Sequence, residues 1–223
     1  TYTLKDGVPY HGDKKNIQPG YWKFKNVDGS EDNQITESDK TIIGNALPDF
    51  YGGINNTFSW KDFDLSIFFT YSYGAEVLNA TKLTNTKTAL TNKNVLSVAD
   101  DAHRWVTINA NGELITNPEE RAVAHFGDNG SNNTYIHSWA IEDASYLKLS
   151  NITLGYTFPK KVINKIGLTK LRLYATGNNL FTWTPYTGFD PEVSTMSSAL
   201  TPGVDFGAYP RSRSFVFGVN VAF

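Results

Sequence analysis

One stretch of the sequence has the residue types of a calcium-binding loop. Side chains with oxygen atoms recur around a glycine between residues 26 and 39, and they are Asn26, Asp28, Asp32 and Asp39. Calcium loops need oxygen ligands at alternate positions, a glycine for the turn and a late carboxylate. The spacing therefore predicts a calcium site with these four ligands. The alternative is an acidic turn that is simply solvated.

A second stretch combines aromatic rings with a carboxylate. Its members are Trp183, Tyr186, Phe189 and Asp190, which lie where an expected strand gives way to a long connection. Binding sites combine apolar and aromatic surfaces with a few polar groups, and a carboxylate accepts hydrogen bonds from sugar hydroxyls. We therefore predict that these four residues contact a substrate such as a carbohydrate. A loop that packs only against itself is the alternative.

Few residues of the chain suit catalysis. The absence of cysteine excludes a disulfide scaffold, a thiolate metal site and a cysteine nucleophile. The four histidines are scattered without ligand spacing, and the sequence contains no phosphate-binding glycine loop, nucleophile elbow or zinc-protease helix. Asp190 and Glu192 could pair for glycoside hydrolysis, but the sequence does not give their separation. We expect a protein that is not an enzyme.

The composition also limits the partners of the chain. The net charge is -2, without a run of lysine and arginine, and this excludes nucleic acid as an expected partner. The sequence has no run of about 18 apolar residues, which is the length that a transmembrane helix requires. The chain starts without methionine or a signal segment, so we expect it to be a processed or partial polypeptide.

The elements that must position these residues are expected to be strands. Between Asp62 and Tyr73, apolar and polar residues alternate over about 12 residues, a length suited to a tilted membrane strand. Similar alternation predicts further strands at Asp49–Trp60, Lys148–Phe158, Lys170–Thr182 and from Ser214 to Phe223. Leu147 and Leu149 are out of phase with the rest of their strand, which predicts a β-bulge near Ser150.

Short and long connections alternate between these strands. Residues 61–62 and 159–169 form short links, whereas residues 74–145 and 185–211 form long ones. Long loops are uncommon in compact soluble domains, but outer-membrane barrels join their strands by short periplasmic turns and long extracellular loops. The fold class is therefore all-β: antiparallel strands of a transmembrane β-barrel. We expect residues 1–48 to be an extracellular loop region with the calcium-type loop, and residues 49–223 to hold five barrel strands.

The sequence resembles the C-terminal part of SusC/RagA-type TonB-linked outer-membrane transporters. Ten blocks in the family's order carry the resemblance: Pro19–Asn26 (PGYWKFKN), Thr41–Asn45 (TIIGN), Pro48–Gly53 (PDFYGG), Phe63–Ser66 (FDLS), Asp143–Leu149 (DASYLKL), Asn151–Tyr156 (NITLGY), Leu171–Tyr174 (LRLY), Gly177–Trp183 (GNNLFTW), Gly188–Glu192 (GFDPE) and Tyr209–Arg211 (YPR). Relative to the family's acidic loop, this chain has two extra residues near Ser30 and an asparagine at position 26.

The resemblance implies a barrel of about 22 strands with an N-terminal plug. Such a transporter lies in the outer membrane of a Gram-negative, Bacteroidetes-like cell and is energised through the TonB complex. It imports oligosaccharides or peptides beneath a SusD-like surface lipoprotein. The plug and the TonB-contacting segment have no counterpart in this chain, so the remaining strands and the plug must come from elsewhere.

Two other functions remain open. A passive porin or an adhesin-type barrel would share the strands but lack the plug. A soluble glycan-binding β-sandwich would share the alternation but not the membrane, so its exposed strand faces would meet water rather than lipid.

The last strand carries a further pattern. Apolar residues occupy every second position up to the final residue, and they are Phe215, Phe217, Val219, Val221 and Phe223. This pattern resembles the signal that the barrel assembly machinery recognises, and the alternative is an ordinary apolar strand. Aromatic residues near strand ends, including Tyr71, Tyr73 and Trp183, are expected to form an aromatic girdle at the membrane interface, with sugar stacking as the alternative.

Overall fold

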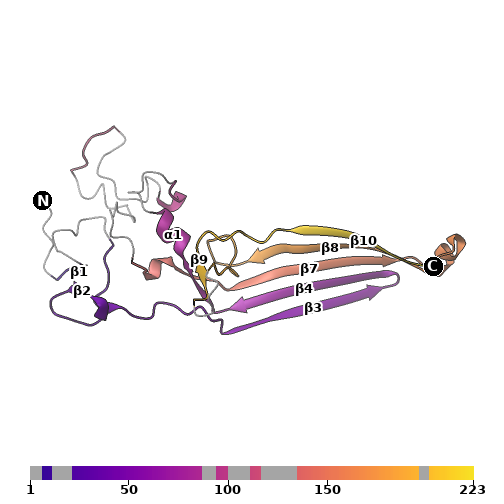
Figure 1. Ribbon diagram of the computed structural model, residues 1–223, viewed down its shortest axis with the longest axis horizontal. Coiled ribbons are helices and arrows are strands. Elements are labelled where there is room, and N and C mark those ends of the chain that lie inside the picture. Colours follow the sequence, from indigo (N-terminus) through magenta and orange to yellow (C-terminus); the bar gives the residue numbers. More distant parts are fainter. Residues whose placement is uncertain (1–6, 12–21, 87–93, 100–110, 117–134, 196–200) are drawn as a thin grey trace. The chain divides into compact units, whose positions relative to one another are not determined.

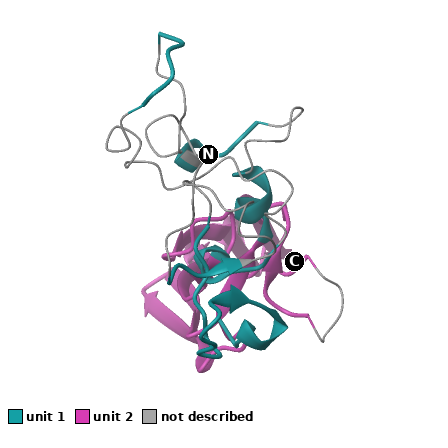
Figure 2. Cartoon of the chain, turned by 90° about the vertical axis from the view of Figure 1, so that its left-hand side faces the viewer, with its two compact units in different colours: residues 1–43, 80–140 teal, residues 44–79, 141–223 magenta. Residues whose placement is uncertain are grey.

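The computed structural model describes residues 7–11, 22–86, 94–99, 111–116, 135–195 and 201–223. The chain divides into two compact units (Figure 2). One contains residues 1–43 and 80–140, and the other contains residues 44–79 and 141–223. The long connection between the second and third predicted strands therefore joins the N-terminal residues in one unit.

The second unit is built around a five-stranded antiparallel sheet. Its strands lie side by side in the order β10-β8-β7-β4-β3 (Figure 1). They are β3 (Phe50–Trp60), β4 (Phe63–Tyr73), β7 (Tyr146–Thr157), β8 (Lys170–Trp183) and β10 (Ser214–Ala222). The five strands expected from the alternation are thus confirmed, with ends that differ by one or two residues.

The two short connections, between β3 and β4 and between β7 and β8, lie at the same end of this sheet. Lys61 adopts a φ of 53° in the turn between β3 and β4, a left-handed conformation typical of hairpin turns. Between β7 and β8, a short helix α2 (Lys160–Ile163) continues into a 3-10 turn η6 (Asn164–Ile166), which ends at Gly167 with a φ of 75°. Glycine tolerates this C-terminal cap conformation without steric cost.

The β-bulge expected near Ser150 is present. The pairing of β4 with β7 shifts between Phe68 and Phe69, and the pairing of β7 with β8 shifts between Leu149 and Asn151. The extra residue returns Leu147 and Leu149 to the face of Ile152 and Leu154, since two residues of a bulged strand oppose one on its partner. The phase slip in the sequence is therefore the signature of this bulge.

A smaller sheet lies at the other end of the strands. It has the order β6-β5-β9 and consists of β5 (Glu76–Asn79), β6 (Ile141–Asp143) and β9 (Val204–Asp205). Val77, Ala144 and Tyr186 form a buried cluster there. Among the described residues, the buried apolar side chains do not form a layer on either face of the five-stranded sheet. The apolar face of this sheet is therefore exposed in this chain.

The first unit has little regular structure in its described part. It contains a two-stranded parallel pair, β1 (Tyr10–His11) and β2 (Gln34–Ile35). Its helical elements are η2 (Glu37–Asp39), α1 (Ala80–Asn85), η3 (Ser97–Ala99) and η5 (Ser138–Ala140). A helix long and apolar enough to cross a membrane is not found in the described residues of either unit.

Candidate functional site

The register of the large sheet separates its side chains into two chemically different faces. Phe63 pairs with Tyr156, Leu65 with Leu154, and Ile67 with Ile152. The same face continues across β8 and β10, where Val219 pairs with Leu173. Many of these side chains are exposed, including Phe217 at 79%. An exposed apolar face of this extent marks a membrane or protein interface, and here it matches the lipid-facing side of a barrel strand.

The opposite face carries polar groups that bond across strands. Asn151 Nδ2 donates to Asn178 Oδ1 at 2.7 Å, and Asn178 Nδ2 donates to Ser214 Oγ at 3.1 Å. Hydroxyl pairs join Thr153 with Thr176 at 2.8 Å and Thr70 with Ser150 at 2.6 Å, the latter through the bulge residue. A polar face of this kind suits the interior of a large barrel.

An ion pair crosses the same polar face. Arg172 of β8 donates from Nε to Asp64 Oδ1 at 3.1 Å and from Nη2 to Oδ2 at 2.5 Å. These strands are not neighbours, because β7 lies between them. The two side chains meet above Gly155 of β7, where a Cβ atom would overlap both the guanidinium and the carboxylate. The bidentate pair therefore depends on a glycine at this position.

Replacing Gly155 by alanine is expected to destabilise the barrel by about 1–3 kcal/mol, because the added methyl group has no room beneath the ion pair. The measurement is denaturant unfolding of the complete transporter in detergent. The control is the same substitution in a variant that also carries Asp64→Ala and Arg172→Ala. There the cost should fall below about 0.5 kcal/mol, since the two side chains that cause the clash are gone. An equal cost in both backgrounds would contradict the steric explanation.

A buried charge cluster lies where β7 meets the connection between β8 and β10. Lys148 is only 3% exposed, and its Nζ forms a salt bridge with Glu192 and lies 3.9 Å from Asp190 Oδ1. Arg211 Nη1 lies 3.4 Å from Glu192 Oε2, the oxygen that also meets Lys148, and the Tyr146 hydroxyl donates to Glu192 Oε1 at 2.7 Å. We call these five residues the Lys148 cluster. Its two cations and two carboxylates balance.

The partners of Glu192 decide its protonation. Burial acts to raise the pKa of Glu192, but hydrogen bonds from Lys148 and Tyr146 and the charges of Lys148 and Arg211 hold that pKa below its usual range. Glu192 is therefore ionised at neutral pH. Since the carboxylate and Lys148 come from different segments, the pair fastens the long connection to the beginning of β7.

A second contact fastens the same connection to the small sheet. The Tyr186 hydroxyl donates to Asp205 Oδ2 at 2.6 Å, and Tyr186 is 5% exposed. Burial and the neighbouring Asp205 carboxylate raise the pKa of the Tyr186 hydroxyl above its ordinary value. Glu142 of β6 accepts two hydrogen bonds from Thr187, one from the backbone N–H at 2.9 Å and one from the hydroxyl at 2.6 Å.

The four residues predicted to contact substrate have different surroundings. Tyr186 and Asp190 are buried and bonded within the chain. Trp183 stacks with Phe181 on the apolar face of the sheet, with ring centroids 5.8 Å apart, a position that favours the membrane-interface alternative. The side chain of Phe189 is 76% exposed beside the Lys148 cluster. Substrate contact by these four residues stays a prediction.

The four predicted calcium ligands hydrogen-bond within their own loop. Asp39 accepts backbone N–H groups from Val27 at 2.7 Å, Asp28 at 3.3 Å and Thr36 at 2.8 Å. The bonds from Thr36 and Val27 outweigh desolvation and hold the pKa of Asp39 below its usual value.

The other three side chains also bond locally. Asn26 Oδ1 accepts from Gly29 N at 2.8 Å, Asp28 Oδ1 from Ser30 N at 2.8 Å, and Asp32 Oδ1 from Gln34 N at 2.9 Å. Within the described part of the chain, no three His, Cys, Asp or Glu side chains are grouped so that they could hold a metal ion. Backbone N–H groups thus bond to all four side chains and close the loop, and calcium binding by these residues stays a prediction.

Side chains of the predicted assembly signal share one face of the edge strand β10. Phe215, Phe217, Val219 and Val221 pair with successive outward positions of β8 and are exposed, as is Phe223. Their recognition by an assembly machinery stays a prediction.

Sequence reasoning did not identify Lys148 or the pair of Asp64 and Arg172. The sequence did contain one signal for Lys148, which lies between two leucines in a predicted membrane strand. A lysine in such a strand is costly unless it has a partner or faces water.

Comparison with known proteins gives sequence relatives that agree with one another. The chain is 35% identical to "TonB-dependent receptor P3" of Formosa agariphila over 92% of its length, and this covers 19% of that protein. It is 30% identical to "TonB-dependent receptor SusC" of Bacteroides thetaiotaomicron over 88% of its length, or 17% of that protein. The chain thus spans about one fifth of these relatives. No protein-family model matches it.

Solved structures give the same answer for the fold. A chain of the RagAB peptide transporter matches 86% of this chain with a TM-score of 0.66 and 24% identity, and 19% of that chain is covered. At this identity the likeness establishes the fold alone.

The matched proteins are receptors and transporters, which confirms the expectation that the chain is not part of an enzyme. The five-stranded sheet, whose faces are apolar on one side and polar on the other, corresponds to part of a barrel that is not closed by this chain. The chain therefore belongs to the SusC/RagA-type TonB-dependent receptors, as a five-stranded segment of their transmembrane β-barrel.

Proposed function

We propose that this chain forms one wall of an outer-membrane transporter that imports a nutrient with energy from TonB. The observation that carries the proposal is the two-faced sheet. One face is apolar and exposed, and the other bears a cross-strand ladder of amides, hydroxyls and an ion pair. The apolar face suits lipid and the polar face suits a hydrated lumen. The names of the relatives favour TonB-linked import over a passive porin.

The location we propose is the outer membrane of a Gram-negative, Bacteroidetes-like cell. The two long connections, residues 74–145 and 184–213, leave the sheet at the same end, opposite the tight turns. In outer-membrane barrels long loops face the exterior, so the Lys148 cluster lies at the extracellular end. A SusD-like lipoprotein at that end is the partner that would enclose the substrate.

The substrate class we propose is an oligosaccharide or a peptide. Phe189 has the most exposed ring of the predicted contact residues, and it lies three positions after Tyr186, which bonds to Asp205. Asp190 belongs to the same connection and is held by Lys148. An exposed aromatic ring whose neighbouring residues are already held by such contacts loses little entropy on binding.

The test is uptake by cells that carry the complete transporter. Growth on single oligosaccharides and on peptides is compared between the wild type, a deletion strain and a strain without TonB. We expect one substrate class to be lost in both mutant strains. Uptake that persists without TonB would overturn the proposal and favour a passive porin. Affinity purification from outer membranes then tests the partner, which should be a surface lipoprotein.

Replacing Phe189 by alanine is expected to reduce uptake roughly two- to tenfold, because one aromatic stacking contact is lost. The amount of transporter in the membrane should not change, since the ring is 76% exposed. The measurement is the initial uptake rate at subsaturating substrate, normalised to transporter abundance. Phe206→Ala is the matched control, because Phe206 is also exposed, at 61%, and was not predicted to contact substrate. Equal effects of the two substitutions would contradict a specific role for Phe189.

A further inference from the structure

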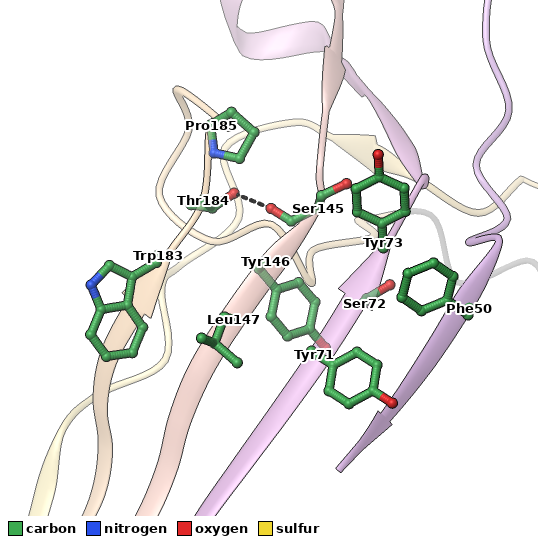
Figure 3. A pocket seen from close by; sticks show the side chains of 10 residues that line it. All are labelled: Phe50, Tyr71, Ser72, Tyr73, Ser145, Tyr146, Leu147, Trp183, Thr184 and Pro185. Carbon is green, nitrogen blue, oxygen red and sulfur yellow. Dashed lines mark hydrogen bonds between the residues drawn. The ribbon is translucent and has the colours of Figure 1, made fainter. Parts of the chain in front are cut away.

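A hollow of about 420 Å³ opens at the end of the sheet that carries the long connections. Figure 3 shows its walls and floor: Phe50, Tyr71 and Tyr73 lie on one side, Trp183 lies on the other, and Leu147 lies between them. The volume falls within the range of about 300–1,000 Å³ that is usual for ligand pockets.

The hollow belongs to the apolar face of the sheet. Phe50 pairs with Tyr73, Tyr71 with Leu147, and Leu147 with Trp183, and these positions are in phase with the exposed apolar residues farther along the strands. Leu147 is smaller than the rings beside it and therefore forms the recessed floor of the hollow, where it is 42% exposed. The hollow is therefore continuous with the lipid-facing surface and is open to an acyl chain.

The side chain of Arg213 lies near the Trp183 side of the hollow. The guanidinium of Arg213 lies 5.3 Å from the ring centroid of Phe181, which stacks on Trp183. Phe181 is in register with Leu149, so this cation–π contact is on the apolar face. Arg213 is exposed, and none of the ion pairs among the described residues includes it. A guanidinium placed beside hydrocarbon without a counter-ion suits a phosphate group, to which it can donate two parallel hydrogen bonds.

We propose that this hollow and Arg213 form a binding site for a phosphorylated glycolipid of the outer leaflet. One acyl chain lies over Leu147 between Trp183 and the rings of Phe50, Tyr71 and Tyr73. The phosphate of the headgroup accepts hydrogen bonds from Arg213. The site goes beyond nutrient import, and it rests on the proposed outer-membrane orientation of the sheet. It would give this part of the barrel a fixed lipid neighbour rather than an exchanging one.

The sheet offers a contrast at its opposite end. Lys61 lies 4.7 Å from the ring centroid of Trp60, so a cation–π pair is present there as well. The hollow described above includes neither residue. Lys61→Gln therefore removes a comparable interfacial cation without touching the proposed site. Leu154→Trp is the matched control for filling the hollow, because it enlarges another leucine of β7 on the same face.

The experiment uses the complete transporter, purified in detergent and stripped of lipid. Lipid A with both phosphates, dephosphorylated lipid A and phosphatidylglycerol are titrated, and bound lipid is counted by native mass spectrometry. We expect lipid A with its phosphates to bind best. Arg213→Gln should weaken its binding about fivefold, as expected for one basic residue beside an anionic lipid. Leu147→Trp should weaken it at least about tenfold by filling the hollow.

The controls decide whether the proposal stands. Leu154→Trp and Lys61→Gln should leave lipid A binding within about twofold of the wild type. The proposal is overturned if all four variants bind equally, or if dephosphorylated lipid A binds as well as the phosphorylated form. Preferential binding of phosphatidylglycerol would also overturn it, because the ligand would then be a phospholipid. Substrate uptake is measured in parallel, so that loss of the lipid site with intact uptake separates this proposal from nutrient import.

Discussion

Replacing Lys148 by alanine is expected to destabilise the barrel by about 3–5 kcal/mol, the cost of leaving buried charges without their partner. Lys148 neutralises Glu192 and lies next to Asp190, and the side chains of these two carboxylates are only 20% and 8% exposed. Arg211 cannot replace the lost cation fully, because its own side chain is 58% exposed and reaches the carboxylates at 3.4 and 4.0 Å. The connection between β8 and β10 should detach from β7.

The measurement is denaturant unfolding of the complete transporter in detergent, followed by its heat-dependent shift in electrophoretic mobility. Lys40→Ala is the control, because Lys40 forms an ion pair with Glu37 in which both side chains are exposed, at 67% and 84%. Exposed pairs of this kind contribute about 0–1 kcal/mol. If Lys148→Ala costs no more than Lys40→Ala, the Lys148 cluster does not hold the connection in place.

Replacing Leu154 by arginine is expected to destabilise the barrel by about 2–4 kcal/mol in lipid, the cost of a cation near the middle of the bilayer. Leu154 lies within β7 on the apolar face, between Leu65 and Ala175, and is 50% exposed in this chain. In a soluble protein an exposed leucine would tolerate arginine with a change of about 0.5 kcal/mol or less. The substitution therefore separates the membrane protein from a soluble sandwich.

Ser66→Arg provides the matched control on the opposite face. Ser66 pairs in register with Thr153, the neighbour of Leu154, so the two positions lie at nearly the same depth. A guanidinium at position 66 would face the polar side, where water can solvate it. We expect it to cost about 1 kcal/mol or less in the same refolding assay in lipid vesicles. Equal costs at positions 66 and 154 would contradict the assignment of the two faces.

The strands and their faces could be predicted because they depend on local pattern. Side chains alternate between the two sides of a strand, so a run such as Phe63, Leu65 and Ile67 assigns one face without knowledge of its neighbours. The bulge at Ser150 could be predicted for the same reason, because the alternation of apolar residues changes phase between Leu149 and Ile152. Length and connection pattern then favoured a barrel over a compact soluble domain.

The candidate site could be predicted only in part. Aromatic and acidic residues of the connection after β8 were recognised by type, but Tyr186 and Asp190 are buried and bonded within the chain. Whether a tyrosine is available to a ligand depends on which segment folds over it. The acidic loop was likewise recognised by spacing, whereas the backbone bonds to Asp39 that close it depend on the path of the chain.

The sequence by itself determined the strands, their two faces and the family of this protein, because alternation and short blocks of residues are local properties. Only the tertiary structure decided the partners of the charged residues. Asp64 and Arg172 are 108 positions apart and meet above Gly155, and Lys148 meets Glu192 across 44 positions. Such contacts are set by strand order and by the paths of long connections. Strand order and connection paths depend on residues far apart in the sequence, so a local pattern does not determine them.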